Sequence, residues 1–206
     1  MMVIDMSGFI GFSLASARNC KPILKELAGL LRGDESVLEI GSGSGQHAVY
    51  FAEQLAGLAW QPSEIAPQLA VLQTNLETHG GANISPPVLL DLRDESWGDS
   101  VSGVDLIFTA NTLHIISWAE VISLFDRLDR VLKPGGRLVL YGPFRYNNAY
   151  TSDSNADFDR WLTARDPDSG IRDFEKVSSL ALEAGLMLEC DISMPANNQL
   201  LVWRQG

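Results

Sequence analysis

The stretch "SVLEIGSGSGQHAVYFA", residues 36–52, constrains the fold more than any other part of this chain. It runs from a short apolar segment, typical of a strand buried in a parallel sheet, into three glycines and then into apolar residues at helical spacing. Glycine adopts positive φ without steric cost and bares the backbone, so a ligand can lie against the amides. The pattern predicts a nucleotide or nucleoside site between a strand and a helix. The glycines are Gly41, Gly43 and Gly45.

The spacing of these glycines excludes three well-known loops. A dinucleotide fingerprint has the form G-x-G-x-x-G, but its third glycine position is occupied by Gln46. A P-loop requires a lysine directly after its last glycine, and no lysine occurs between Lys25 and Lys133. A nucleophile elbow requires serine at the centre of G-x-S-x-G, where this chain has Gly43.

Around this stretch, apolar runs alternate with segments of helical spacing. Such alternation implies right-handed crossovers and therefore an α/β fold with a doubly wound, mostly parallel sheet. The expected strands are 36–40, 58–64, 86–92, 103–111 and 137–144, and the expected helices are 22–31, 48–55, 69–76 and 121–132, the last ended by "KPGG".

The C-terminal part departs from this alternation. Residues 145–173 are polar, with one amphipathic helix near Phe158, and predict an inserted lid or substrate wall. After a helix ending near Ala184, two apolar segments flank "PANN" and predict an antiparallel C-terminal hairpin. We expect residues 1–206 to form one domain, since no repeat or change of composition divides them.

The composition restricts the partners. A net charge of −11 repels phosphate backbones, which makes nucleic acid an improbable substrate and favours a small molecule or a protein. The two cysteines, Cys20 and Cys190, are far apart and predict a reducing, cytoplasmic location. The three histidines share no ligand spacing, so no metal site is expected, and no apolar run is long enough to cross a membrane. The oligomeric state stays open.

The pattern E-x-G-x-G-x-G, which begins at Glu39, resembles motif I of the class I methyltransferases that use S-adenosyl-L-methionine (SAM). The resemblance implies a Rossmann-like, seven-stranded sheet with an antiparallel C-terminal strand. It also implies that the loop around Ser42 receives the methionine end and ribose of SAM. In that family the acidic residue before the loop helps to orient the methionyl amine, and Glu39 matches it.

The ends of the later strands supply further candidates, because open α/β sheets bind ligands at the carboxyl ends of their strands. Glu64 ends the second strand, where a carboxylate can accept hydrogen bonds from two ribose hydroxyls; the alternative is a residue that only begins the next helix. The resemblance implies that Asp91 accepts from the adenine amino group and that the Leu92 amide meets a ring nitrogen. A solvent-exposed turn is the alternative for Asp91. Asn111 is implied to present its carbonyl to the methionyl amine.

Residues near the transfer side are candidates for catalysis and substrate binding. His114 and Tyr141 are optional bases, needed only if the acceptor carries a proton, and packing is the alternative for His114. Asn155, Asp157 and Arg160 lie in the polar segment and are expected to contact substrate; the alternative is a solvated lid whose charges pair with one another.

Longer stretches narrow the resemblance. The chain resembles the methyltransferase-like 26 family, a domain of unknown function, over about 18–203. This likeness adds Asn19 to the expected substrate residues, whereas Glu64 stands where that family is expected to have Asp. The stretches that carry it are "RN" at 18–19, "SGSGQHAVYFA", "WQPSE", "LHIISW", "YGPF", "TSDSNADFDRWL", "DPDSGIRD" and "MPANN".

The sequence therefore favours a SAM-dependent methyltransferase acting on an unidentified small molecule or protein side chain. The alternative is a non-catalytic module that binds SAM or S-adenosylhomocysteine (SAH) and acts through partners. An NAD-dependent oxidoreductase is disfavoured by Gln46 and by the lack of a Tyr-x-x-x-Lys pair.

Overall fold

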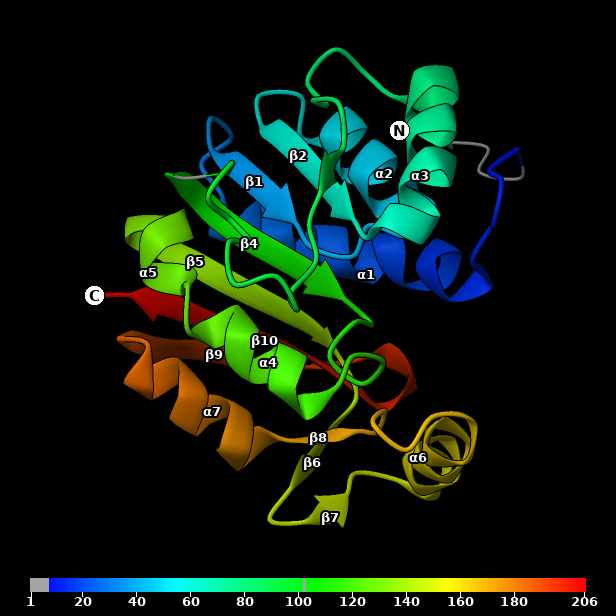
Figure 1. Ribbon diagram of the computed structural model, residues 1–206, viewed down its shortest axis with the longest axis vertical. Helices are drawn as coiled ribbons and strands as arrows, with labels where there is room; N and C mark the ends of the chain where they lie inside the picture. The colour runs from blue at the N-terminus through cyan, green and yellow to red at the C-terminus, as the bar shows by residue number, and fades with distance from the viewer. Residues whose placement is uncertain (1–7, 102) are drawn as a thin grey trace. The chain divides into compact units, whose positions relative to one another are not determined.

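A computed structural model describes residues 8–101 and 103–206 of the chain (Figure 1). The described residues fall into two compact units, one ending at Asp91 and the other beginning at Leu92. Each unit has strands and helices of its own.

The first unit alternates helices and strands along the chain. Its three strands pair in parallel in the order β3-β2-β1, with Ser36 opposite Ala59 and Ser63 opposite Val88. The elements are α1 (Leu14–Leu30), β1 (Ser36–Glu39), α2 (Gln46–Gln54), β2 (Ala59–Glu64), α3 (Ala66–His79) and β3 (Val88–Leu89).

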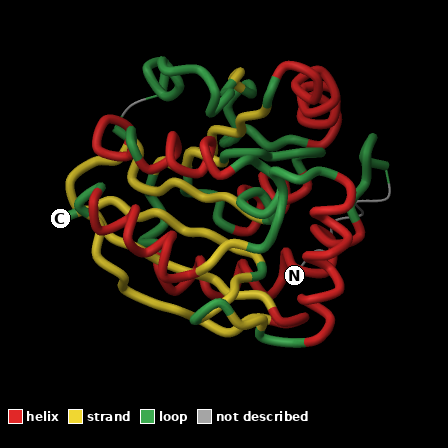
Figure 2. The backbone as a smooth tube through the Cα atoms, turned by 60° about the horizontal axis from the view of Figure 1, so that its bottom comes forward, coloured by secondary structure: helices red, strands yellow, loops and turns green. Residues whose placement is uncertain are grey.

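The second unit begins with a parallel pair and ends in an antiparallel hairpin. Its main strands have the order β4-β5-β10-β9, and a small separate sheet has the order β7-β6-β8. Figure 2 colours these strands yellow and the helices between them red. The elements are β4 (Val104–Ala110), α4 (Trp118–Phe125), α5 (Leu128–Val131), β5 (Leu132–Gly142), β6 (Phe144–Tyr146), β7 (Ala149–Tyr150), α6 (Asp153–Arg165), β8 (Arg172–Asp173), α7 (Phe174–Glu183), β9 (Leu186–Met194), η1 (Pro195–Asn197) and β10 (Asn198–Gln205).

The predicted fold class is confirmed. The two units supply three and four strands to a seven-stranded α/β arrangement of the Rossmann-like type. Pairing is parallel within the first unit and between β4 and β5, and antiparallel for β10 against both of its neighbours. Whether the chain is one domain stays a prediction.

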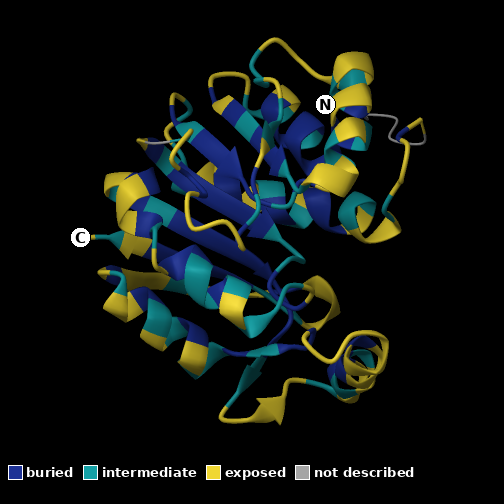
Figure 3. Ribbon diagram, in the orientation of Figure 1, coloured by how far each residue is buried: buried dark blue, intermediate teal, exposed yellow. Residues whose placement is uncertain are grey.

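Burial of the strands gives each unit its core. Val37 and Leu38 of β1 are buried, as expected of a strand covered on both faces, and so are Leu138 and Val139 of β5. Figure 3 colours buried residues dark blue along both strands. Apolar burial of this kind is the dominant favourable term in folding, and it fixes the strand ends from which the candidate residues project.

Several predicted boundaries are wrong. The first helix begins at Leu14, eight residues before Pro22, because the Ser13 hydroxyl caps it by accepting from the Ser16 amide at 3.2 Å. The expected helix 121–132 is interrupted, since Arg127 has φ −123° and ψ 4° and separates α4 from α5.

Other differences concern strands and turns. The third strand spans only Val88–Leu89, and "KPGG" lies inside β5, where positive φ at Gly135 accompanies a shift of register. The C-terminal hairpin is confirmed, and its turn has positive φ at Ala196 and Asn197.

Candidate functional site

The predicted glycine loop leads from β1 into α2, and its three glycines have φ of 71° at Gly41, 57° at Gly43 and 83° at Gly45. A Cβ at Gly45 would lie 2.9 Å from Leu72 Cδ1 and 3.3 Å from Leu76 Cδ2, because α3 packs against the loop. A Cβ at Gly43 would meet no described atom within 4 Å. Gly45 is therefore required by packing, whereas Gly43 leaves its face open.

Glu64, at the end of β2, is bound to this loop. Its Oε2 accepts from the Gly43 amide at 2.9 Å, and its Oε1 accepts from the Ile65 amide at 3.1 Å. The second contact agrees in part with the alternative of a residue that only begins a helix, since Ile65 is the N-cap residue of α3. A carboxylate has about four acceptor positions, so these two bonds leave capacity for ligand hydroxyls. The ribose role stays a prediction.

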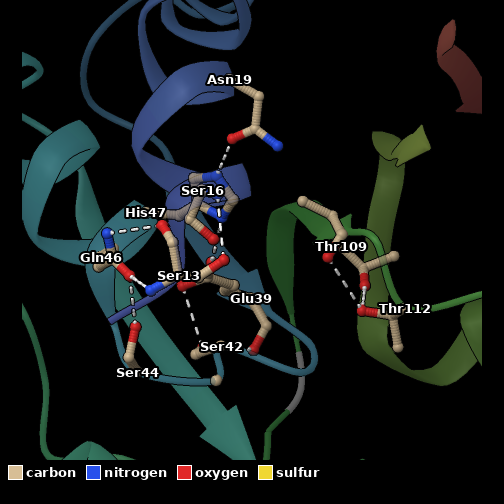
Figure 4. Close-up of polar contacts among 12 residues, drawn as sticks. Ser13, Ser16, Asn19, Glu39, Ser42, Ser44, Gln46, His47, Thr109 and Thr112 are labelled. Atoms are coloured by element: carbon tan, nitrogen blue, oxygen red, sulfur yellow. Dashed lines mark hydrogen bonds and ion pairs between the residues drawn. The ribbon is translucent and has the colours of Figure 1, made fainter. Parts of the chain in front are cut away.

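Glu39 is 1% exposed and directs its carboxylate into the first unit (Figure 4). Its Oε2 accepts from Trp60 Nε1 and from Ser42 Oγ, each at 3.0 Å, and its backbone carbonyl accepts from Ser63 Oγ at 2.6 Å. Burial raises the pKa of Glu39 to about 7, although the bonds from Trp60 and Ser42 oppose the rise. Its proposed contact with the methionyl amine stays a prediction.

Asn19, a predicted substrate residue, is buried in α1 and pairs with α2. Its Oδ1 lies 2.6 Å from His47 Nε2, and His47 Nδ1 lies 4.0 Å from Glu39 Oε1 (Figure 4). Burial lowers the pKa of His47 to about 4, so the ring is neutral at pH 7. The sequence reasoning gave His47 no role, because its partners lie 28 and 8 positions away along the chain.

Two buried amide side chains attach the segment before α1, Ile10–Ser13, to the glycine loop; we call this segment the N-terminal strap. Gln46 Oε1 accepts from the Ser13 amide at 2.6 Å and from Ser44 Oγ at 2.9 Å, while its Nε2 donates to the Ser13 carbonyl at 3.2 Å. Asn75 Nδ2 donates to the carbonyls of Ile10 and Ser44, each at 2.9 Å. Sequence reasoning missed both roles.

The predicted adenine contacts follow β3. Asp91 is half-buried and ends the first unit, and Leu92 is buried and begins the second. The Leu92 carbonyl accepts from Ser123 Oγ at 2.6 Å, which holds this position against α4. The contacts of Asp91 and Leu92 with adenine stay predictions.

In the second unit, Asn111 directly follows β4 and has φ 59°. Asparagine tolerates this left-handed conformation better than most residues, which explains its place at the turn. Its amide donates to the Tyr141 carbonyl at 2.8 Å, so the end of β4 is joined to β5. The side chain of Tyr141 is buried. The ligand contact of Asn111 and the catalytic role of Tyr141 stay predictions.

His114 is buried in the loop after β4. Its ring meets Phe158 edge-on at 5.3 Å, and a Cβ at Gly142 would lie 3.6 Å from its Nδ1. Burial lowers the pKa of His114 to about 4, and the charge of Arg172 also acts to lower it. A base works best when its pKa lies near the operating pH, so this environment favours the packing alternative.

The end of the predicted lid holds the loop that carries His114. Arg172 Nε donates to the Leu113 carbonyl at 2.9 Å, and its Nη2 donates to the carbonyls of Ile116 and Asp168. The Gly170 amide donates to the His114 carbonyl at 2.9 Å. Arg172 lies near the end of the segment predicted to be a lid or substrate wall, and its guanidinium organises the backbone of the loop that carries His114.

The predicted substrate residues of α6 have partners of their own. Asn155 is buried and donates through Nδ2 to Thr151 Oγ1 and to the Asn197 carbonyl, each at 2.9 Å. Asp157 and Arg160 are exposed and form an ion pair one turn apart. These contacts agree with the alternative of a lid whose charges pair with one another. Roles in substrate binding stay predictions.

Residues 8–101 and 103–206 were searched for clusters of metal-ligating side chains and for membrane-spanning helices. Within these ranges no group of three or more His, Cys, Asp or Glu side chains is arranged to hold a metal ion. No helix in them combines the length and apolar character that crossing a membrane requires.

Comparison with solved structures places this fold among methyltransferases. The chain is similar to an O-methyltransferase family protein from Burkholderia thailandensis, with 16% identity and a TM-score of 0.78 over 93% of this chain and 57% of that one. It is equally similar to human N-acetylserotonin methyltransferase in complex with SAM, with 16% identity and a TM-score of 0.78 over 93% and 53%.

A third similar structure is CalO1, a methyltransferase of calicheamicin biosynthesis in its SAH-bound form, with 17% identity and a TM-score of 0.74 over 93% and 54%. The chain thus spans a little more than half the length of these proteins. At such identities the likeness shows the fold. A family model described as "Protein of unknown function (DUF938)" matches residues 11–205, and the chain belongs to that family.

Proposed function

We propose that this protein is a SAM-dependent methyltransferase whose acceptor is a small molecule or a protein side chain. The observation that carries the proposal is the loop after β1, where Gly43 has positive φ, leaves its Cβ position open and donates its amide to Glu64. The loop thus offers a backbone surface without a side chain next to a carboxylate that accepts hydrogen bonds. A ribose requires both features.

The residues present fit SAM better than they fit a dinucleotide. A pyrophosphate needs a helix N-terminus with bare amides, but the N-terminus of α2 carries the buried Gln46, which is bonded to the N-terminal strap. Glu39 and Glu64 also place two carboxyl groups beside the loop, and in their ionised forms these would attract the cationic SAM and repel a pyrophosphate.

In this proposal SAM supplies an activated methyl group on its sulfonium. The protein's part is to bind, align and exclude water. Glu64 accepts from the ribose hydroxyls, Glu39 orients the methionyl amine, and Asp91 and the Leu92 amide select adenine. Asn111, held in the left-handed conformation after β4, would accept from the methionyl amine through its carbonyl. His114 and Tyr141 contribute as bases only for an acceptor that must lose a proton.

The acceptor class remains to be identified by screening. The similar proteins include an O-methyltransferase family protein and an N-acetylserotonin methyltransferase, so hydroxyl-bearing small molecules are the first class to test. The chain covers little more than half of those proteins, and protein side chains therefore belong in the same screen. We also propose that the protein belongs with the methyltransferase-like 26 family and that it is located in the cytoplasm.

The experiment is titration calorimetry with SAM, SAH and NAD, followed by a screen for transfer of a labelled methyl group. We expect SAM and SAH to bind and NAD to bind much more weakly. Equal or tighter binding of NAD would overturn the cofactor assignment. Tight SAH binding without transfer to any hydroxyl, amine or protein acceptor would favour the non-catalytic binding module.

A further inference from the structure

A row of buried polar groups joins the first helix to the glycine loop. Asn19 of α1 pairs with His47 of α2 at 2.6 Å, and His47 faces Glu39 of β1 at 4.0 Å. Glu39 accepts from Ser42 of the loop at 3.0 Å, and Ser42 Oγ in turn accepts from the Ser63 amide of β2 at 3.2 Å. All five residues are buried, so water does not compete for these groups.

The direction of the hydrogen bonds in this row is set by its first member. A carboxamide oxygen can only accept, so the bond to Asn19 Oδ1 requires the proton of the neutral His47 ring to be on Nε2. His47 Nδ1 then presents a lone pair towards Glu39 Oε1. A residue of α1 thereby selects one tautomer of the His47 ring, and the Nδ1 side of that ring faces the Glu39 carboxyl group at 4.0 Å.

Glu39 connects this arrangement to the loop backbone. Its carboxylate holds Ser42, and the Ser42 amide donates to the Ser63 carbonyl at 2.9 Å. The Gly45 amide donates back to the Ser42 carbonyl at 2.9 Å, so the position of Ser42 determines the turn that bares Gly43. A change in the Glu39 carboxyl group therefore alters the backbone on which the ligand is proposed to lie.

We propose that His47 is a positioning residue of the cofactor site and that Asn19 acts through it, so that α1 helps to set the geometry of the glycine loop. The inference rests on the proposed function, because it names residues that prepare the SAM site without touching SAM. It also gives Asn19 a role different from the substrate contact expected from the sequence.

The test compares three variants by SAH calorimetry and by amide exchange of Ser42 and Gly45 in the ligand-free protein. His47→Leu removes both ring nitrogens, and we expect SAH to bind about tenfold more weakly and both amides to exchange faster. His47→Gln restores a donor at the Nε2 position, so its SAH affinity should stay within about threefold of wild type. Asn19→Leu should lie between them.

Asn83→Leu is the matched structural control. Asn83 also uses a carboxamide to hold two backbone carbonyls of the first unit, those of Ala52 and Leu58 at 2.9 and 3.0 Å, and it lies outside the row. We expect this variant to lose thermal stability with SAH affinity kept within about twofold of wild type.

Three results would overturn the inference: unchanged SAH affinity and unchanged exchange in a folded His47→Leu; a loss in His47→Gln as large as in His47→Leu; or an equal loss in Asn83→Leu. Should His47→Leu fail to fold, the comparison of His47→Gln and Asn19→Leu with the control still decides. Wild-type protein that binds no SAH would overturn the proposed function, and the exchange of the ligand-free amides would then judge the positioning role alone.

Discussion

The glycine loop of the first unit and the polar segment of the second, residues 145–173, use their polar side chains differently. Around the loop, Glu39, Gln46 and Asn75 are buried and bond to backbone or side chains of other elements. In the polar segment, Asp157 and Arg160 pair with each other in solvent. Buried polar networks specify one geometry, whereas exposed pairs contribute little. The buried bonds therefore specify the backbone geometry around the glycine loop, whereas in the polar segment the exposed pair specifies little and the geometry depends on the bonds of Asn155 and Arg172 to backbone carbonyls.

The largest expected effect tests whether the loop is a ligand surface. Gly43→Val should abolish SAH binding, because valine strains a residue with φ 57° and fills the open face of the loop. Gly33→Val is the matched control, since Gly33 has φ 101° and an equally open Cβ position just after α1. Calorimetry measures SAH binding to both folded variants. Equal affinities of Gly43→Val and Gly33→Val for SAH would show that the glycine loop is not the ligand surface.

The second prediction concerns Glu64. Its replacement by glutamine should weaken SAM binding by on the order of 2 to 4 kcal/mol, because charge-assisted hydrogen bonds to the ribose are lost. Glu53→Gln makes the same change of charge on the exposed face of α2 and should leave binding unaltered. A Glu64→Gln variant that binds as tightly as wild type would reduce Glu64 to a residue that begins α3.

The third prediction sharpens the role of Glu39. Its pKa of about 7 means that the carboxyl group is mostly neutral at pH 6 and mostly ionised at pH 8. If the ionised form orients the methionyl amine, SAH should bind about tenfold more tightly at pH 8 than at pH 6. This dependence of SAH affinity on pH should vanish in Glu39→Gln. His47, with a pKa of about 4, does not titrate in this range, and Cys20, with a pKa raised to about 12, does not either.

The stability of the ligand-free protein should change in the opposite direction. A carboxyl group whose pKa is raised on folding stabilises the folded state below its unfolded pKa, and this contribution is lost as the pH rises through about 7. Urea unfolding at pH 5 and pH 8 measures it. If the free energy of unfolding changes equally between pH 5 and pH 8 in wild type and in Glu39→Gln, then Glu39 does not titrate as its burial requires.

The smallest effects on cofactor binding are expected in α6. Asn155→Ala and Arg160→Ala should leave SAM affinity nearly unchanged while lowering transfer to any acceptor found. Arg160→Ala should change stability by less than about 1 kcal/mol, as for an exposed ion pair. Loss of SAM binding in both folded variants would assign the segment to the cofactor site, and unaltered transfer would make it a structural insertion.

The fold was predictable because its signals are local. Strand alternation, the glycine loop and the C-terminal hairpin each depend on residues close together in sequence, and all three are present. The start of α1 was missed because Pro22 suggests a helix start, while the actual cap, Ser13, lies outside the apolar pattern.

The inner partners of the candidate site were not predictable. Trp60 reaches Glu39 from 21 positions away, and Asn75 reaches Ile10 from 65, so no sequence spacing indicates either bond. The reach of Arg172 back to Leu113 is of the same kind. Such contacts depend on how strands and helices are brought together, which a single sequence does not encode in its local pattern.

Gln46 has a consequence for how this protein could change its ligand. One substitution, Gln46→Gly, would complete the G-x-G-x-x-G pattern of a dinucleotide fingerprint that begins with Gly41 and Gly43. The same change would remove the three hydrogen bonds that hold Ser13 and Ser44. A change of cofactor by this single substitution would therefore cost the protein one of the two amide side chains that attach the N-terminal strap to the glycine loop, and only Asn75 would remain.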